Sequence, residues 1–221
     1  MDGAGGIEDM IPIYDFTQYD DSWWAARLGK ITASPANKLI TTKGLPTDGK
    51  TREDYCYRLA MEQAYGQYAG SEYTNYGMQR GHEMEPKART AFEIATGFNV
   101  QTVGIVFEDE QRKWACSPDG MMETAGLEIF CPEAPNAICC LRNPEKAISI
   151  AGKFQQIQMS LMITGFEQWY FEVYYPGPAP LIQIVKRDED FISKLRAELD
   201  KFCIEIIMTA KEIKGTLAGV S

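Results

Sequence analysis

Two carboxylates lie close together near the middle of the chain, where they could hold a metal ion. Asp119 is flanked by Pro118 and Gly120, which are typical of a turn. Glu128 interrupts the short apolar run at residues 127–131, which predicts a strand. A turn carboxylate beside a strand carboxylate offers oxygen ligands to a hard cation such as Mg²⁺ or Mn²⁺. The same pattern also fits a solvated hairpin with two unrelated acids.

The expected strand has two faces of different character. Side chains alternate along a strand, so Leu127, Ile129 and Cys131 share one face, which can be buried. Glu128 and Phe130 share the other face. We therefore expect Phe130 to lie beside Glu128 on a polar face, where it has nothing obvious to pack on.

The residues around the two acids resemble a known nuclease family. Ser-Pro-Asp-Gly at 117–120 and Gly-Leu-Glu-Ile-x-Cys-Pro at 126–132 are similar to motifs of the phage lambda exonuclease family of alkaline exonucleases. These enzymes are restriction-endonuclease-like nucleases, whose signature is an Asp followed by Glu-x-Lys on the next strand. Further similar blocks lie at residues 24–34, 81–86, 156–158 and 169–171. In this chain Phe130 stands where the family has Lys.

The resemblance implies which residues form the active site. Asp119, Glu128 and the backbone carbonyl of Ile129 would ligate a metal ion, and Glu85 would hold a second ion or its water. Gln156 is also placed in the active site by the resemblance. The pattern alone is less specific, because Glu85 precedes an expected helix, where an acid simply complements the helix dipole.

A second group of residues suits a phosphate. Arg27 and Ser34 lie near the ends of expected helices, where backbone N–H groups are free, and an Arg fork beside a hydroxyl can bind phosphate. By spacing alone, the pair also fits an exposed Arg and a routine helix cap. The resemblance implies that these two residues bind the 5′-phosphate of a DNA end and that Ser117 joins them. We expect the single histidine, His82, to be a polar residue near the site and not a ligand.

Phe130 changes the expected chemistry. In the family, the Lys orients and activates the attacking water and balances charge in the transition state. Phe130 has no proton to exchange and no charge, and loss of such a group costs about 10²–10⁴-fold in rate. We therefore expect strongly reduced turnover. The alternative is a twisted hairpin in which Phe130 is core and another lysine, such as Lys153, enters the site.

Composition limits the possible classes of protein. With 221 residues and 45% hydrophobic residues, the chain can fold as one domain over 1–221, with a loose arm at 1–20. No apolar run is long enough for a membrane span. The six cysteines include no Cys-x-x-Cys pair, which favours reduced thiols in a bacterial host cytoplasm over a metal or iron–sulfur site. A net charge of −9 means that any DNA path must be a local basic lining.

The expected elements alternate between helices and strands. Patterns and punctuation predict helices at 23–28, from Pro35 onward, 52–63, 86–96, 147–164 and from Asp188 to Gly215. They predict strands at 100–108, 112–116, 127–131, 169–175 and 181–186, and a flexible flap after Pro132. This order predicts an α/β fold with a central mixed β-sheet flanked by helices, and the resemblance implies the restriction-endonuclease-like core.

These observations favour a divalent-metal-dependent 5′-to-3′ exonuclease on double-stranded DNA, of phage recombination type, with one or two Mg²⁺ or Mn²⁺ ions. The resemblance implies a ring-shaped homotrimer that threads DNA ends bearing a 5′-phosphate, and cooperation with a single-strand annealing protein. A catalytically inactive DNA-end-binding or recombination-scaffold protein is the alternative, favoured by Phe130. The acidic composition favours a third possibility, a structural or interaction protein.

Overall fold

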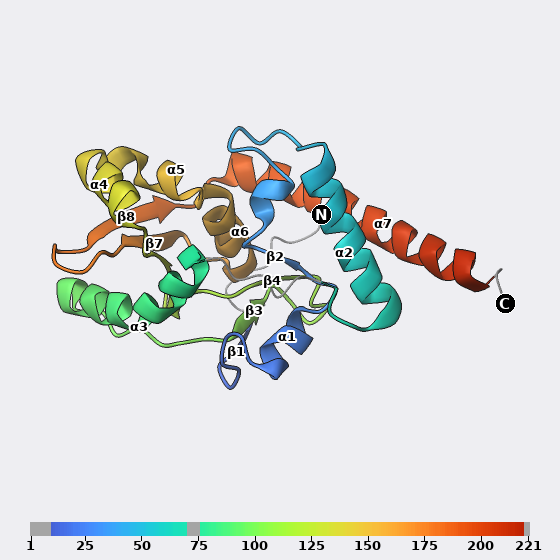
Figure 1. Ribbon diagram of the computed structural model, residues 1–221, viewed down its shortest axis with the longest axis horizontal. Coiled ribbons are helices and arrows are strands. Elements are labelled where there is room, and N and C mark those ends of the chain that lie inside the picture. Colours follow the sequence, from blue (N-terminus) through green and yellow to red (C-terminus); the bar gives the residue numbers. More distant parts are fainter. Residues whose placement is uncertain (1–9, 70–75, 219–221) are drawn as a thin grey trace.

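The computed structural model describes residues 10–69 and 76–218, and its strands within these residues form two four-stranded sheets. The first sheet has the order β1-β3-β4-β2, and its strands are labelled in Figure 1. The second sheet has the order β5-β6-β7-β8. β2 runs parallel to β4, and β6 runs parallel to β7, whereas the other neighbours are antiparallel. The predicted α/β class with mixed strands flanked by helices is confirmed, although the strands divide between two sheets. The strands are β1 (Ile11–Ile13), β2 (Ile31–Thr32), β3 (Ile105–Phe107), β4 (Trp114–Cys116), β5 (Gly120–Met121), β6 (Gly126–Phe130), β7 (Gln168–Val173) and β8 (Leu181–Lys186).

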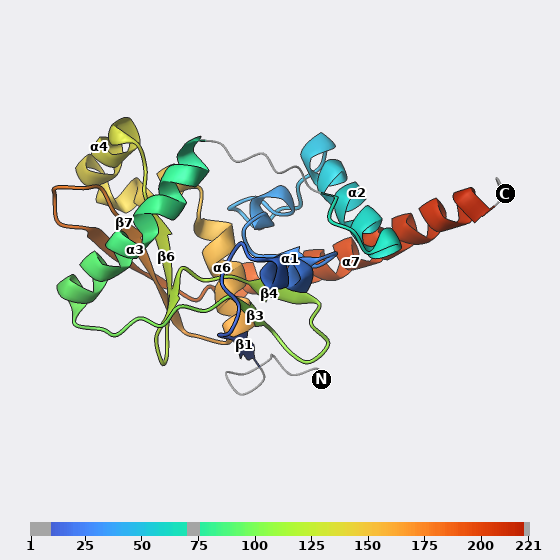
Figure 2. The same cartoon turned by 60° about the horizontal axis from the view of Figure 1, so that its bottom comes forward.

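Helices cover both sheets and fill the space between them (Figures 1 and 2). The α-helices are α1 (Asp21–Arg27), α2 (Lys50–Tyr65), α3 (Tyr76–Thr96), α4 (Ala134–Arg142), α5 (Ala147–Ala151), α6 (Phe154–Thr164) and α7 (Glu189–Ala218). Short 3₁₀ turns form η1 (Ala36–Lys38) and η2 (Pro144–Lys146). None of the helices within 10–69 and 76–218 is both long and apolar enough to cross a membrane.

The central helix α6 lies against both sheets and against α7. Ile157, Leu161 and Met162 are fully buried in the largest core cluster. The predicted single helix over 147–164 is wrong, because Gly152 adopts a left-handed conformation with φ of 66° and ends α5. Glycine reaches this conformation without steric cost, so the chain turns there and α6 starts in a new direction.

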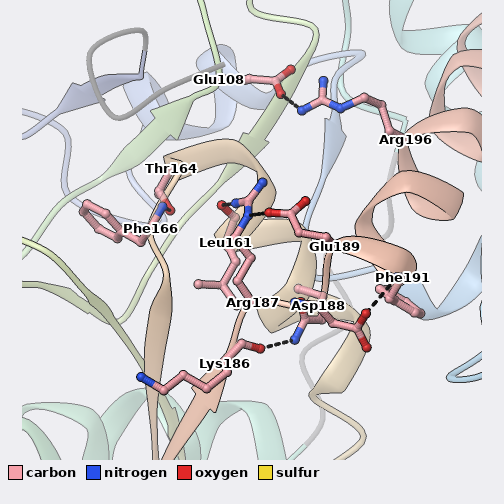
Figure 3. Close-up of polar contacts among 11 residues, drawn as sticks. Glu108, Leu161, Thr164, Phe166, Lys186, Arg187, Asp188, Glu189, Phe191 and Arg196 are labelled. Carbon is pink, nitrogen blue, oxygen red and sulfur yellow. Dashed lines mark hydrogen bonds and ion pairs between the residues drawn. The ribbon is translucent and has the colours of Figure 1, made fainter. Parts of the chain in front are cut away.

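The long helix α7 packs along α2 and is joined to α6 through the end of β8. The predicted start at Asp188 is confirmed, because its carboxylate caps the helix by accepting the Phe191 N–H at 3.0 Å. Arg187 donates to the Leu161 carbonyl at 2.6 Å, which ties β8 to α6 (Figure 3). The predicted end at Gly215 is wrong, because α7 continues to Ala218. Met208, an apolar residue of this helix, is exposed.

The N-terminal arm is more ordered than the sequence predicts. Residues 1–9 lie outside the described residues, but β1 pairs with β3 in the antiparallel register Ile11↔Phe107 and Ile13↔Ile105. Ile11 and Ile13 pack against a small core cluster under α1, so their burial offsets the entropy of ordering the strand. The expectation of a loose arm over 1–20 is therefore wrong from residue 10 onward.

Helix α3 begins ten residues before the predicted start at Pro86, which lies inside it. Proline in a helix interior removes one hydrogen bond and favours a break. Here Ala88 and Phe92 on the following turns are buried against β6, and this packing holds the helix across the proline. The predicted end is confirmed, because Thr96 is the last helical residue and Gly97 has φ of 76°.

Two further predictions need correction. The predicted flap after Pro132 is helix α4, with Pro135 in its first turn and Ala137 and Cys140 buried three residues apart. The predicted strand over 100–108 is shorter, because only Ile105–Phe107 belongs to the sheet. Within the described residues, the segment before it contributes one isolated bridge, between Gln101 and Met121.

Glu172 on β7 makes the stability of the fold depend on pH. It is fully buried and neither carboxylate oxygen has a hydrogen-bond partner among the described residues. Burial raises the pKa of Glu172 from 4.5 to about 8, against the opposing charge of Arg89. Between pH 4.5 and about 8, the folded state keeps a proton on Glu172 that the unfolded state has released. The free energy of unfolding therefore falls as the pH rises through this window.

We expect Glu172→Gln to remove this pH dependence. The free energy of unfolding of the variant, minus that of the parent, should grow from pH 5 to pH 8 by up to about 1.4 kcal/mol per pH unit. Urea unfolding at a series of pH values measures this difference, with the exposed Glu167→Gln as control. A difference that stays constant with pH would show that Glu172 titrates normally.

Candidate active site

One cavity of about 900 Å³ contains every site residue that the sequence predicts. Its walls include residues of α1, the 3₁₀ turn η1, α2, α3, the chain between β4 and β5, β6, α4 and the start of α6. The predicted residues that line it are Arg27, Ser34, Glu85, Ser117, Asp119, Glu128, Ile129, Phe130 and Gln156. Segments separated by more than 100 residues thus meet at one place, which the sequence could indicate only through resemblance.

Glu128 is the centre of a polar cluster on the cavity wall. Its side chain is 3% exposed, and one carboxylate oxygen accepts from the Lys153 amine at 2.7 Å. The Gln156 amide donates to both carboxylate oxygens at 2.8 Å, and its own oxygen accepts from Lys153 at 3.0 Å. Every oxygen of this buried carboxylate is therefore satisfied by charge or by hydrogen bonds, which burial of an anion requires.

The break between α5 and α6 positions Lys153. Lys153 is the residue before α6, and its N–H donates to the Ile148 carbonyl at 3.1 Å. Burial alone would lower the pKa of Lys153, but the negative charges of Glu128 and Asp119 outweigh it, and the pKa is raised. The Lys153 amine is therefore a cation at neutral pH, held against the carboxylate of β6.

Asp119 lies where the chain passes from the first sheet to the second, between β4 and β5. Its carboxylate accepts the Ile129 N–H at 2.7 Å, and its own N–H donates to the Leu127 carbonyl at 3.1 Å. These two bonds fix the turn against β6. Burial raises the pKa of Asp119 well above its ordinary value, and the charges of Glu128 and Glu85 raise it further.

Glu85 reaches the cavity from the interior of α3. Arg89, one helical turn later, donates to the Glu85 carboxylate at 2.7 Å and to the Asp119 carbonyl at 2.9 Å. Burial raises the pKa of Glu85, and the nearby charge of Glu128 adds to this. Sequence reasoning missed Arg89, because a helix that starts at Pro86 hides the i, i+4 relation that would have revealed it.

The donor set suits a hard cation, although the described residues present no ready-made trio of metal-ligating side chains. Asp119, Glu85 and Glu128 supply carboxylate oxygens, the ligands that Mg²⁺ and Mn²⁺ prefer. The carboxylates of Glu85 and Glu128 raise the pKa of Asp119, and a bound cation would relieve this repulsion. The contact between Asp119 and Ile129 uses the N–H of Ile129 and not its carbonyl. Ligation of a metal ion by the Ile129 carbonyl therefore stays a prediction.

Phe130 has a packing role that the sequence did not reveal. The alternation along β6 is as predicted, since Leu127, Ile129 and Cys131 belong to the cluster that faces α3. Phe130 lies on the other face, where it is partly buried against the largest core cluster. The expectation that it has nothing to pack on is therefore wrong. Lys153 reaches Glu128 without the twisted hairpin that the sequence-based alternative required.

Arg27 forms a polar group with residues of the first sheet. It donates to the hydroxyls of Ser117 and Thr32, each at 3.1 Å, and its guanidinium lies 4.2 Å above the Trp23 ring. Ser34 lines the same cavity and is exposed. Its predicted role as a helix cap is wrong, because η1 begins at Ala36 and makes no side-chain cap bond.

Comparison with known proteins gives the family. A family model described as YqaJ-like viral recombinase domain matches residues 22–167. No curated protein matches the chain significantly. An alkaline exonuclease, LHK-Exo from Laribacter hongkongensis, is 27% identical with a TM-score of 0.79, covering 91% of this chain and 100% of that one. The same enzyme in complex with dAMP is 28% identical over the same shares, with a TM-score of 0.78.

A phage-related exonuclease from Haemophilus somnus is 15% identical, with a TM-score of 0.65 over 83% of this chain and 96% of that one, and supports the fold alone. The family model covers well over half of the sequence, including the segments that carry Arg27, Glu85, Asp119, Glu128 and Gln156. The predicted resemblance to alkaline exonucleases is confirmed, and the chain belongs to the family of the YqaJ-like viral recombinase domain.

Proposed function

We propose that this protein is a divalent-metal-dependent exonuclease that degrades the 5′ strand from the ends of double-stranded DNA. The observation that carries the proposal is the Lys153 amine, 2.7 Å from Glu128 in the cavity that also holds Asp119. This cluster supplies a carboxylate pair and a cation, although the motif position itself is Phe130. Lys153 then takes the role that the family gives to a strand lysine.

The residues of the chain have distinct tasks in this reaction. Asp119, Glu128 and Glu85 would hold one or two Mg²⁺ or Mn²⁺ ions, which lower the pKa of water and neutralise charge at phosphorus when bound. Hydrolysis adds a water oxygen to phosphorus and breaks its bond to the 3′ oxygen, which takes up a proton. The raised pKa of Lys153 suits it to stabilise negative charge in the transition state, and not to act as a base.

The DNA end is held by the polar group around Arg27. Its guanidinium and the Ser117 hydroxyl lie 3.1 Å apart at the cavity wall, with the exposed Ser34 nearby in the same cavity. Guanidinium and hydroxyl groups are strong donors to a phosphate. The related LHK-Exo forms a complex with dAMP, a nucleoside 5′-monophosphate. This supports binding of a nucleotide 5′-phosphate by this chain as well.

We expect Arg27→Gln to weaken binding of 5′-phosphorylated duplex more than binding of 5′-hydroxyl duplex. A charged hydrogen bond contributes about 1.5–3 kcal/mol, so the extra loss should be about 10–150-fold. Fluorescence anisotropy with the two duplexes measures it, and the exposed Arg142→Gln controls for general charge. Equal losses of affinity for the two duplexes would show that Arg27 contacts the DNA backbone in general and not the 5′-phosphate.

A digestion assay tests the proposed function. Linear duplex DNA labelled on one 5′ or 3′ end should be degraded only with Mg²⁺ or Mn²⁺, and the 5′ label should be released first. Closed circular duplex should stay intact, because it has no end. Release of the 3′ label first would refute the polarity, and cutting of circles would refute exonuclease action.

Phe130 favours one alternative, a catalytically inactive protein that binds DNA ends or serves as a recombination scaffold. That protein would bind 5′-phosphorylated ends and show no metal-dependent release of nucleotides, so the same assay separates the two. The family resemblance further suggests a ring-shaped homotrimer and a single-strand annealing partner. Light scattering of the purified protein would test the trimer.

A further inference from the structure

Tyr19 is held in a backbone conformation that its residue type rarely adopts. Its φ is 75°, in the left-handed region that few residues other than glycine occupy. Both neighbours are anchored: Gln18 donates to the Pro118 carbonyl at 2.8 Å, and Asp20 caps α1 by accepting the Trp23 N–H at 2.7 Å. Such strain persists where the surroundings fix it, often at ligand-binding sites. The anchored backbone holds the Tyr19 side chain beside the turn that carries Asp119.

The Tyr19 ring belongs to a series of aromatic rings along the cavity wall. Its centroid lies 4.7 Å from the His82 ring and 6.4 Å from the Trp24 ring, and Trp24 lies 4.9 Å from Tyr68. All four side chains line the cavity. Tyr19 remains 48% exposed and Tyr68 40% exposed. Part of this aromatic surface is therefore open to a ligand.

The aromatic series also lies close to the two parts of the proposed active site, the Arg27 group and the carboxylates. The Trp23 ring, 4.9 Å from Tyr19, carries the Arg27 guanidinium on its face at 4.2 Å. Tyr19, Asp119 and Glu85 line the same cavity. Burial raises the pKa of the Tyr19 hydroxyl, and the nearby charges of Asp119 and Glu85 raise it further. Tyr19 thus has Arg27, the proposed ligand of the 5′-phosphate, on one side and the proposed metal-binding acids Asp119 and Glu85 on the other.

We propose that Tyr19, continued by Trp24 and Tyr68, stacks on the unpaired base of the terminal nucleotide whose 5′-phosphate Arg27 binds. This inference rests on the proposed function and adds a base subsite to it. Every nucleobase has a π face, so stacking on aromatic side chains tolerates any sequence. Such a contact suits an exonuclease that must accept each base in turn. It would hold the frayed strand at the cavity after each cut.

The test compares two duplexes with a one-nucleotide 5′-phosphorylated overhang, which carries either adenine or no base. Binding is measured in EDTA, where the DNA is not cut. For the parent protein, the base should raise the affinity about 5–150-fold, the effect of stacking one base. Tyr19→Asn should bring this ratio close to one, since asparagine tolerates the left-handed backbone and lacks the ring. Tyr19→Phe should keep the ratio.

The exposed Tyr14, on the same segment and outside the cavity lining, provides the matched control Tyr14→Asn. A 2-aminopurine at the overhang should be quenched by the parent and by Tyr19→Phe, and not by Tyr19→Asn. Equal affinity of the parent for both ends would overturn the inference, as would a base effect that survives Tyr19→Asn or is lost in Tyr19→Phe. If the parent still digests linear duplex, only the base subsite has failed; if it neither binds nor digests DNA ends, the proposed function has failed as well.

Discussion

Lys153→Met should slow metal-dependent cleavage about 10²–10⁴-fold, the loss that follows removal of a positioned proton donor or cation. Methionine keeps the length of the side chain and removes the charge that lies 2.7 Å from Glu128. Binding to DNA ends should change much less, because one charge among many phosphate contacts is a small contribution. Single-turnover rates at saturating enzyme measure the chemical step alone.

A second substitution separates a catalytic lysine from a merely structural one. In the Lys153→Met background, Phe130→Lys returns an amine to the face of Glu128 and should recover part of the lost rate. The exposed Lys146→Met should leave the rate unchanged. In the otherwise unchanged protein, Phe130→Lys should gain little, because Glu128 already has a lysine partner. A gain of about 10²–10⁴-fold from Phe130→Lys alone would instead show that the protein lacks a working lysine.

Asp119→Asn is expected to lower cleavage by at least about 10³-fold, because a ligated cation supplies several kcal/mol of transition-state stabilisation. The amide oxygen can still accept the Ile129 N–H, so the turn should keep its place against β6. Binding of Mn²⁺ should weaken, as titration calorimetry would show. Thermal stability should not fall, because the variant no longer buries a carboxylate whose pKa is raised.

The matched control for Asp119→Asn is Glu123→Gln, which removes an exposed carboxylate at the turn between β5 and β6. It should leave both the cleavage rate and Mn²⁺ affinity at the parent level. Unchanged Mn²⁺ affinity in Asp119→Asn itself would contradict the metal site. Unfolding of that variant would show that the charge, and not the hydrogen bond, holds the turn.

The parts of the fold that the sequence predicts well are those governed by local chemistry. The β6 strand, the α3 end at Thr96 and the start of α7 after Asp188 all follow from residues next to each other in the chain. Asp119 and Glu128 belong to this group, since turn and strand signals in the sequence predict that the two carboxylates lie close together. Resemblance then supplied Arg27, Glu85 and Gln156, whose convergence in one cavity no spacing rule could give.

The missed features depend on tertiary packing. Pro86 signals a helix start, yet burial of Phe92 against β6 holds one helix across it. The left-handed Gly152 divides a helix that apolar periodicity alone would continue. The contact of Lys153 with Glu128, which the sequence offered only as an alternative, requires both that break and the placement of α6 against the two sheets. Local propensity has no information about either.

The position of Lys153 at the start of α6 also changes what keeps the amine and the carboxylate in register. A lysine on β6 would be fixed relative to Glu128 by the strand backbone that both share. Lys153 depends instead on how α6 sits between its neighbours, and a slip of α6 by one residue would move it by about 1.5 Å. Hydrophobic contacts of Ile157 and Leu161, which touch no substrate, thus set the alignment of the charged pair. In this protein the packing of the hydrophobic core around α6 therefore determines the geometry of the proposed reaction centre.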